Sequence, residues 1–281
     1  MIENYFLSAV HLKNIPERIA YFGELFLGAP YVNGPQGEGE DAEFDQSPLY
    51  RFDCFDCVTY VNNVLALSFS NNTLEFKHNL LKLNYYDSKP EYQNRFHFMS
   101  IDWNSQNQKN NFLRDMTADI AEPEYAIGEI DKPNWFLKRS LDDIKLVNAV
   151  NTTVKKNLAE KLKKLQNLSQ HFKKQTARLA YLPTQKLLER NILEKISHGA
   201  IIEVVRPNWN LKDKIGTNLH VSHIGFGIRK NNNLYFRHAS SEHKKVEEVL
   251  LKNYLQNFLD SATIKGVNIQ CAINDNISHL K

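Results

Sequence analysis

Cysteine is scarce in this sequence: among 281 residues only Cys54, Cys57 and Cys271 occur. A low, odd number is not the pattern of a disulfide-stapled domain, and Cys54 with Cys57 offers too few ligands for a zinc cluster. Long apolar runs are also missing, since no stretch approaches the roughly 20 residues that a membrane span needs. The N-terminus lacks a basic start followed by an apolar stretch, so no signal peptide is visible.

An excess of one charge is equally lacking. The chain has 35 Lys and Arg against 32 Asp and Glu, a formal net charge of +3. So small an excess does not predict a nucleic-acid partner. Because 42% of the residues are hydrophobic, the chain can bury an ordinary core, as one large domain or two small ones.

Charge is nevertheless concentrated in two segments. Residues 29–50 form a glycine-rich acidic loop, for which we predict a solvated surface loop. A calcium site is the alternative, although the spacing does not match an EF-hand. Residues 142–178 combine many lysines with an apolar stripe, which predicts a basic helical stretch. A solvated helix face explains these lysines, and attraction of an anionic glycan or nucleic acid is the alternative that stays open.

Hydrophobic periodicity puts helices first and strands last, the order of an α+β fold. The predicted helices cover residues 12–27, a segment beginning near residue 57, and residues 74–85, 142–178 and 183–199. The predicted strands, rich in β-branched and aromatic residues, cover residues 200–205, 220–228, 234–240 and 267–273. Residues 86–140 are turn-rich and show no clear period.

Cys57 is the candidate nucleophile. It falls in the first turn of its predicted helix, whether Asp53 or Asp56 is the N-cap. Unpaired amides and the helix dipole at such a position favour the thiolate. Since a lone cysteine on a helix is more often core filler, a partner base is required elsewhere. Cys54 is not followed by a run that continues the apolar stripe, so we predict a structural role for it.

The predicted strand at residues 220–228 carries the candidate base. Alternation puts His223 on one face together with Gly225 and Gly227. The glycines would leave open space beside the imidazole, where a substrate or a helix could approach. His220 points to the opposite face, so this His-x-x-His pair cannot chelate a metal. We therefore predict no metal site and no cofactor.

His238 on the following strand is the candidate orienting group. A two-residue turn at 230–231 puts His223 opposite His238, whereas a turn at 231–232 puts it opposite Ser240 and makes the histidines diagonal neighbours. Their Cβ atoms would be about 5 Å or about 7 Å apart. Either arrangement lets one imidazole hydrogen-bond the other, which gives nucleophile, base and orienting group.

Four short segments carry a combined pattern: FLGAPYVNG (26–34), FDCVTYV (55–61), VSHIGF (221–226) and RHASS (237–241). Together they resemble the NlpC-type cell-wall cysteine peptidases, bacterial papain-like enzymes that cut peptidoglycan. The resemblance implies that Cys57, His223 and His238 are the catalytic triad and that Tyr31 lies beside the nucleophile in the substrate groove. The sequence departs from the family in the Val-Thr after the cysteine, in the long separation of Cys57 from His223, and in Gly199-Ala200, where Gly-Asp is commoner.

The long segment between the catalytic positions resembles one branch of that family, the N-acetylmuramoyl-L-alanine amidases. The similarity lies in RFHFMSIDW (95–103) and DMT (115–117). It implies one papain-like catalytic domain over residues 1–281, in which N-terminal helices, including the cysteine helix, pack on a C-terminal antiparallel sheet or barrel. Residues 86–198 would be a large, mostly helical insert that recognises substrate and covers the core.

The insert contains residue types suited to a sugar–peptide ligand. Trp103 offers a flat apolar face, and Arg95 with Asp102 offers charged hydrogen bonds, since arginine binds carboxylates bidentately. A buried Arg–Asp pair that pins the insert to the core is the alternative. We also assign His97 and Asp56 to substrate binding.

These observations predict a cysteine amidase that hydrolyses the bond between N-acetylmuramic acid and L-alanine through an acyl-enzyme. Its substrate would be peptidoglycan or a soluble muropeptide. The alternatives are a γ-D-glutamyl–diaminopimelate endopeptidase with the same triad, and a module that binds cell-wall fragments without turnover. The resemblance also implies a periplasmic or cell-envelope location, and it leaves the oligomeric state open.

Overall fold

The helices of the protein lie mainly in the N-terminal half of the chain. A computed structural model describes residues 2–147, 152–189 and 191–273. Its α-helices are α1 (Ile2–Ser8), α2 (Ile15–Leu25), α3 (Cys57–Ser68), α4 (Thr73–Asn84), α5 (Asn104–Lys109), α6 (Thr117–Ile120), α7 (Lys132–Leu137), α8 (Thr152–Asn167), α9 (Thr184–Leu188), α10 (Lys212–Ile215) and α11 (Leu251–Gln256). None of these helices is long and apolar enough to cross a membrane.

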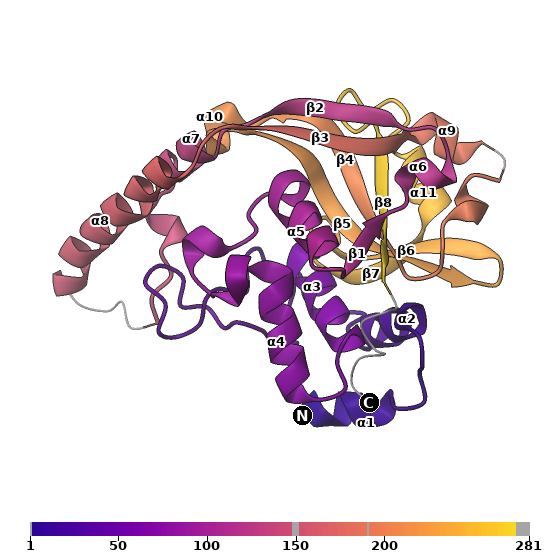
Figure 1. Ribbon diagram of the computed structural model, residues 1–281, viewed down its shortest axis with the longest axis horizontal. Helices are drawn as coiled ribbons and strands as arrows, with labels where there is room; N and C mark the ends of the chain where they lie inside the picture. The colour runs from indigo at the N-terminus through magenta and orange to yellow at the C-terminus, as the bar shows by residue number, and fades with distance from the viewer. Residues whose placement is uncertain (1, 148–151, 190, 274–281) are drawn as a thin grey trace.

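The strands form one antiparallel sheet. They are β1 (Leu113–Asp115), β2 (Glu124–Ile130), β3 (Gln175–Pro183), β4 (Ala200–Asn210), β5 (Asn218–Lys230), β6 (Asn233–Ser240), β7 (Lys245–Leu250) and β8 (Gly266–Ala272). Their order in the sheet is β2-β3-β8-β4-β5-β6-β7, and β1 pairs with β8. Figure 1 shows the sheet above the helices of the N-terminal third. The predicted α+β fold, with early helices against a late antiparallel sheet, is confirmed.

The main core lies between the N-terminal helices and one face of the sheet. Phe22 of α2 and Tyr60 and Val61 of α3 pack in one buried cluster with Ile224 and Phe226 of β5. Each of these side chains is essentially inaccessible to solvent. The 2-residue period of β5 therefore gives one face to α3, as predicted, and leaves the other face for polar groups.

Residues 86–198 contain more helix than strand, in line with the prediction, but they also contribute to the sheet, which the sequence did not predict. This segment supplies β1, β2 and β3, and β2 pairs with β3 along its whole length at the edge of the sheet. Of the predicted basic helix at 142–178, α8 forms the middle and residues 175–178 belong to β3, while residues 148–151 lie outside the described residues. The sequence did not reveal β2 because its exposed face carries the large apolar residues Tyr125 and Ile127, while its inner face includes the small residues Ala126 and Gly128, which obscures the period of 2.

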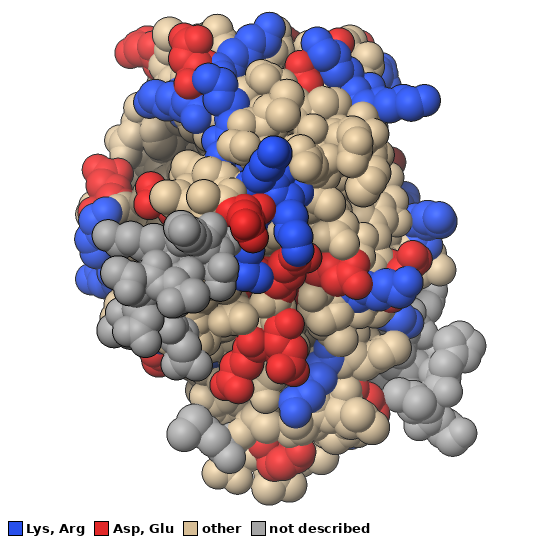
Figure 2. Space-filling view, turned by 90° about the vertical axis from the view of Figure 1, so that its left-hand side faces the viewer, with Lys and Arg blue, Asp and Glu red and all other residues tan. Residues whose placement is uncertain are grey.

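The lysines at the α8 end of the molecule contact nearby acidic groups. Lys164 pairs with Glu43 at 3.2 Å, and Lys174 lies 3.1 Å from Glu129 and 3.0 Å from Asp131. Figure 2 shows acidic and basic side chains intermixed over this face. The arrangement agrees with the predicted solvated, charge-compensated surface, in which exposed pairs contribute little to stability.

Candidate active site

Cys57 is the first residue of α3, as predicted. Asp56 is the N-cap: its Oδ1 accepts the Thr59 amide at 2.8 Å, and Thr59 Oγ1 accepts the Asp56 amide at 2.9 Å. This reciprocal capping box fixes the helix start at the cysteine. Asp53 instead forms an exposed pair with Arg51. Cys57 is partly exposed, whereas Cys54 is buried, in agreement with their predicted roles.

The cysteine and the predicted base line one cavity of about 170 Å³. The walls come from α3, from β5 and from the segment around the π-helical turn Met99–Trp103. The lining residues are Cys57, Val58, His97, Phe98, Met99, Ser100, Leu219, His220, Val221, Ser222, His223 and Ile224. A larger cavity of about 590 Å³ lies under the acidic loop and contains neither Cys57 nor His223. We place the active site in the smaller cavity because the reactive groups converge there.

The two strands that carry the histidines separate near the nucleophile. Pairing of β5 with β6 ends at Phe226 and Arg237. The main-chain amide of Ile224, beyond that point, is free to hydrogen-bond the Cys57 sulfur. Cys57, in the helical layer, is thus held against β5, the strand of the sheet that carries the base His223.

The histidine pair forms with the second of the two predicted registers. The turn is at Asn231 and Asn232, whose positive φ values of 48° and 64° suit a two-residue hairpin turn. His223 and His238 are therefore diagonal neighbours, and His223 Nε2 lies 2.7 Å from His238 Nδ1. We predicted that Gly225 leaves open space beside His223 for a substrate or a helix, but it serves a different purpose. A Cβ on Gly225 would come within 2.8 Å of the His238 Cβ, so the space admits the second histidine rather than a substrate.

Burial decides the resting charge of the thiol. It raises the pKa of Cys57 to about 12, and the neighbouring Asp56 carboxylate adds to the rise, while hydrogen bonds from main-chain amides oppose it. The predicted preference of the helix start for the thiolate is outweighed at this position, since loss of water destabilises a charged group more than a helix terminus stabilises it.

Burial also keeps both imidazoles neutral. It lowers the pKa of His223 to about 4 and that of His238 to about 3. The charges of His223 and His243 add to the lowering at His238. At neutral pH, His223 therefore holds one proton and has one ring nitrogen free to accept another.

Tyr31 lies beside the nucleophile, as the resemblance implied. Its main chain bridges to Phe55. Burial raises the pKa of its hydroxyl to about 12, and the charges of Cys57 and Asp56 add to the rise. Asp56 itself is a structural residue. Its second oxygen, Oδ2, accepts the Gly34 amide at 3.0 Å, so both carboxylate oxygens are occupied and the predicted contact with substrate is not supported.

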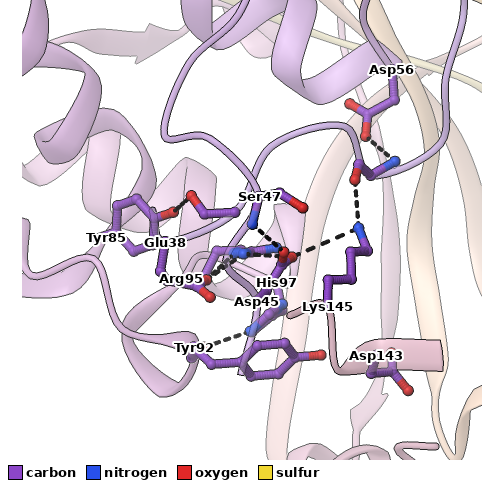
Figure 3. A network of polar contacts seen from close by, with 12 residues as sticks. Glu38, Asp45, Ser47, Asp56, Tyr85, Tyr92, Arg95, His97, Asp143 and Lys145 are labelled. Carbon is purple, nitrogen blue, oxygen red and sulfur yellow. Dashed lines mark hydrogen bonds and ion pairs between the residues drawn. The ribbon is translucent and has the colours of Figure 1, made fainter. Parts of the chain in front are cut away.

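Arg95 is part of a buried ion-pair network rather than of the cavity wall. Its Nε donates to Glu38 Oε1 at 2.6 Å, and it pairs with Asp45 Oδ2 at 3.2 Å. Both acidic residues are at most 5% exposed, so the predicted solvated loop is wrong for them, whereas Glu40, Asp41 and Glu43 of the same loop are exposed, as predicted. Figure 3 shows the network continuing through Lys145 and Gly34 to Asp56. The alternative prediction, an ion pair that pins this segment to the core, describes Arg95, with different partners.

Asp102 and Trp103 are buried, which corrects their predicted role as ligand residues. Asp102 is 1% exposed and pairs with Lys132. Trp103 is fully buried, and its Nε1 donates to Asn62 Oδ1 at 2.8 Å. The tryptophan therefore anchors its segment to α3 and offers no face to a sugar.

His97 is the predicted ligand residue that reaches the cavity. Its Nε2 lies 2.7 Å from the Tyr92 carbonyl oxygen, and burial holds its pKa well below the usual range. Sequence analysis missed Ser100, which lines the same cavity, and Glu247, which lies behind His238. The β-branched residues Val246 and Val249 in KVEEVL (245–250) were the signal that could have revealed β7.

The described residues contain no group of three or more His, Cys, Asp or Glu side chains that could hold a metal ion. His220, the other histidine of the His-x-x-His pair, accepts the Asn208 amide on Nδ1 at 2.9 Å. The chemistry that the arrangement supports is therefore that of a thiol, a neutral imidazole and an orienting imidazole.

Comparison with known proteins identifies the family of the chain. Residues 21–263 match the family profile described as AmiA-like, N-acetylmuramoyl-L-alanine amidase-like. A crystal structure of a DUF1460 protein from Legionella pneumophila is similar with a TM-score of 0.92 and 37% identity, over 97% of this chain and 93% of that chain. A crystal structure of an N-acetylmuramoyl-L-alanine amidase from Bacteroides uniformis is similar with a TM-score of 0.66 and 25% identity, over 92% and 99%. No curated protein sequence matches the chain. The chain belongs to the N-acetylmuramoyl-L-alanine amidase-like family.

Proposed function

We propose that this protein is a cysteine amidase that hydrolyses the amide between N-acetylmuramic acid and L-alanine, in peptidoglycan or in a muropeptide. One observation carries the proposal. Cys57 and His223 line the same cavity, and His223 Nε2 lies 2.7 Å from His238 Nδ1. The family description and the name of the Bacteroides uniformis relative support the choice of bond.

In the proposed reaction, Cys57 attacks the lactyl carbonyl carbon of the muramic acid while His223 takes the thiol proton. The tetrahedral oxyanion is stabilised by a main-chain amide at the start of α3. His223 then protonates the leaving amine of L-alanine, and the acyl group stays on sulfur. A water molecule, activated by the same imidazole, releases the acid and the free thiol. His238 holds His223 in place throughout.

The cavity wall suggests how the sugar is recognised. His97 and Ser100 reach the cavity from residues 86–198, the segment that we propose recognises substrate within one catalytic domain, 1–281. We assign them to the acyl side of the scissile bond, and we assign Tyr31, which interacts electrostatically with Cys57, to substrate binding as well. Because the substrate is a cell-wall component, we also propose a periplasmic or cell-envelope location.

A defined disaccharide-peptide tests the choice of bond. Incubation with the protein should release an intact stem peptide that begins with L-alanine, and mass spectrometry of the products would identify it. The same peptide without its sugar lacks the scissile amide, so little or no cleavage of it is expected. Cys57→Ala serves as the matched control for contaminating activity.

Two other results would replace the proposal. Cleavage of the free stem peptide between D-glutamate and the diamino acid would identify a γ-D-glutamyl–diaminopimelate endopeptidase. Tight binding of the disaccharide-peptide without any product would identify a binding module. Alkylation by iodoacetamide separates an enzyme from such a module before any substrate is available. If His223 takes the thiol proton, Cys57 should react faster than Cys54 and Cys271 despite its raised pKa.

A further inference from the structure

Three adjacent strands align three titratable side chains behind the nucleophile. His223 lies on β5 and His238 on β6, and Glu247 on β7 is the direct cross-strand partner of His238. Residues paired in this way share one face of the sheet, with Cβ atoms about 5 Å apart. Glu247 Oε1 lies 3.7 Å from His238 Nε2, while His238 Nδ1 lies 2.7 Å from His223 Nε2. The carboxylate is thus the outer end of a row that leads to Cys57.

The positions of the protons in this row follow from the contacts. His223 Nε2 is occupied by His238, so only Nδ1 of His223 remains to accept a proton from the thiol. A neutral His223 with a free Nδ1 carries its proton on Nε2 and donates it to His238 Nδ1. His238 must then carry its own proton on Nε2. Catalysis therefore requires the Nε2–H tautomer of His238.

The proton on His238 Nε2 has no hydrogen-bond acceptor in this row of three side chains. His238 is 4% exposed, and its Nε2 is buried with no partner at hydrogen-bond distance. A buried donor of this kind needs an acceptor. Glu247 Oε1 is about 0.5 Å beyond the normal hydrogen-bond range and is the facing carboxylate on the paired strand.

Other charged groups around this pair do not offer His238 a competing contact. His243 Nδ1 lies 2.6 Å from the same Glu247 oxygen and fixes the carboxylate from the solvent side. Tyr254 of α11 packs against the His238 ring with a centroid distance of 5.5 Å. Glu242, which is exposed, shares a cavity of about 420 Å³ with these residues but has no contact with His238.

We infer that Glu247 is a positioning residue that selects the Nε2–H tautomer of His238 and thereby keeps His223 Nδ1 free to act as the base. It acts through His238 and does not touch the substrate. The inference rests on the proposed Cys57 chemistry, but it concerns proton positions that can be observed in the free enzyme.

The first test measures the tautomer directly. Nitrogen-15 NMR of the imidazoles should show His238 protonated on Nε2 in the wild type. In Glu247→Ala the buried donor loses its acceptor, which should shift the equilibrium toward the Nδ1–H tautomer by about tenfold. Glu247→Gln keeps the shape of the side chain, and its amide can donate as well as accept, so a smaller shift in the same direction is expected. This isosteric variant decides the matter if Glu247→Ala does not fold.

The second test measures the consequence for the nucleophile. The rate of Cys57 alkylation by iodoacetamide at neutral pH should fall about tenfold in Glu247→Ala, because removal of an orienting group from a functional histidine costs about that much. Glu242→Ala, which removes an acidic side chain from the same cavity, should react like the wild type. In the amidase assay, kcat should fall while KM stays within about twofold.

Unchanged tautomer populations in both Glu247 variants would overturn the inference, as would equal alkylation rates in Glu247→Ala and Glu242→Ala. Neither measurement uses a substrate, so a wrong choice of substrate and a wrong role for Glu247 give different results. Cleavage of another bond with a shifted tautomer would refute only the proposed function. Cleavage of the muramoyl amide without any tautomer shift would refute only the role of Glu247.

Discussion

Two polar clusters in this protein have similar residue types and opposite surroundings. Around Arg95, the carboxylates of Glu38 and Asp45 are buried against a guanidinium and away from the cavity of Cys57. Around His223 and His238, the groups are just as deeply packed, but one edge opens into that cavity and the charges are suppressed. The first cluster pairs opposite charges, whereas the second keeps neutral groups with exchangeable protons. The difference shows that pairing and access, more than residue type, separate a structural cluster from a reactive one.

The largest effect is expected when the two neighbouring cysteines are replaced one at a time. Cys57→Ala should reduce turnover of a muramoyl-peptide to background, because no other group in the cavity can form the acyl-enzyme. Cys54→Ala should keep turnover within about threefold, since Cys54 is 5% exposed and lies outside the cavity. Initial rates with one defined substrate measure both variants. The reverse result would make Cys54, which precedes α3, the nucleophile.

Arg95→Met tests whether the ion-pair cluster is structural. Removal of the guanidinium leaves the buried Glu38 without its ionic partner and Asp45 with only Lys145 at 3.7 Å, so the free energy of unfolding should fall by about 3 to 5 kcal/mol. Urea denaturation followed by circular dichroism measures the loss. If the variant keeps its stability and instead raises KM for a sugar-containing substrate, Arg95 binds ligand after all and the comparison fails.

Glu203→Gln adds a third buried group to these two clusters. The Glu203 carboxyl is buried, has no ionic partner among the described residues and does not line the cavity of Cys57. It accepts from Asn104 at 3.0 Å, its other oxygen is unpaired, and burial raises its pKa to about 8. The folded state then holds a proton that the unfolded state loses above about pH 4.5, so wild-type stability should fall as pH rises from 4.5 through 8.

The glutamine variant lacks this titration. Its unfolding free energy should exceed that of the wild type by roughly 5 kcal/mol at pH 9, and the difference should shrink toward pH 5. Thermal unfolding at several pH values gives the comparison. A difference that does not vary with pH would mean that the Glu203 carboxyl is already ionised in the folded state near pH 5.

Trp103→Phe is expected to have the smallest effect. The substitution keeps most of the buried ring and removes the hydrogen bond to Asn62, so stability should fall by about 1 to 2 kcal/mol. The value of kcat/KM should stay within about threefold of the wild type, because the side chain does not reach the cavity. A tenfold loss of kcat/KM without loss of stability would restore Trp103 as a sugar-binding residue.

The parts of the site that could be predicted rest on short-range chemistry. Asp56 caps the helix at Cys57 through a residue three positions away, and strand alternation alone puts His223 opposite to His220. The parts that could not be predicted depend on partners far apart in the chain. Arg95 meets Glu38 across 57 positions, and nothing near Arg95 in sequence indicates whether its partner is a ligand or the protein itself.

Local hydrogen bonds and side-chain periods were sufficient to predict three features. These are the early helices followed by late strands, the helix start at Cys57, and the shared face of His223 and His238. Four other features became known only from the folded structure. They are the register of the β5–β6 hairpin and the extension of the sheet by β2 and β3. The burial of Trp103 and Asp102 and the position of Glu247 next to His238 are the other two. These outcomes follow from long-range packing, in which a residue's environment is supplied by segments that its own neighbours do not specify.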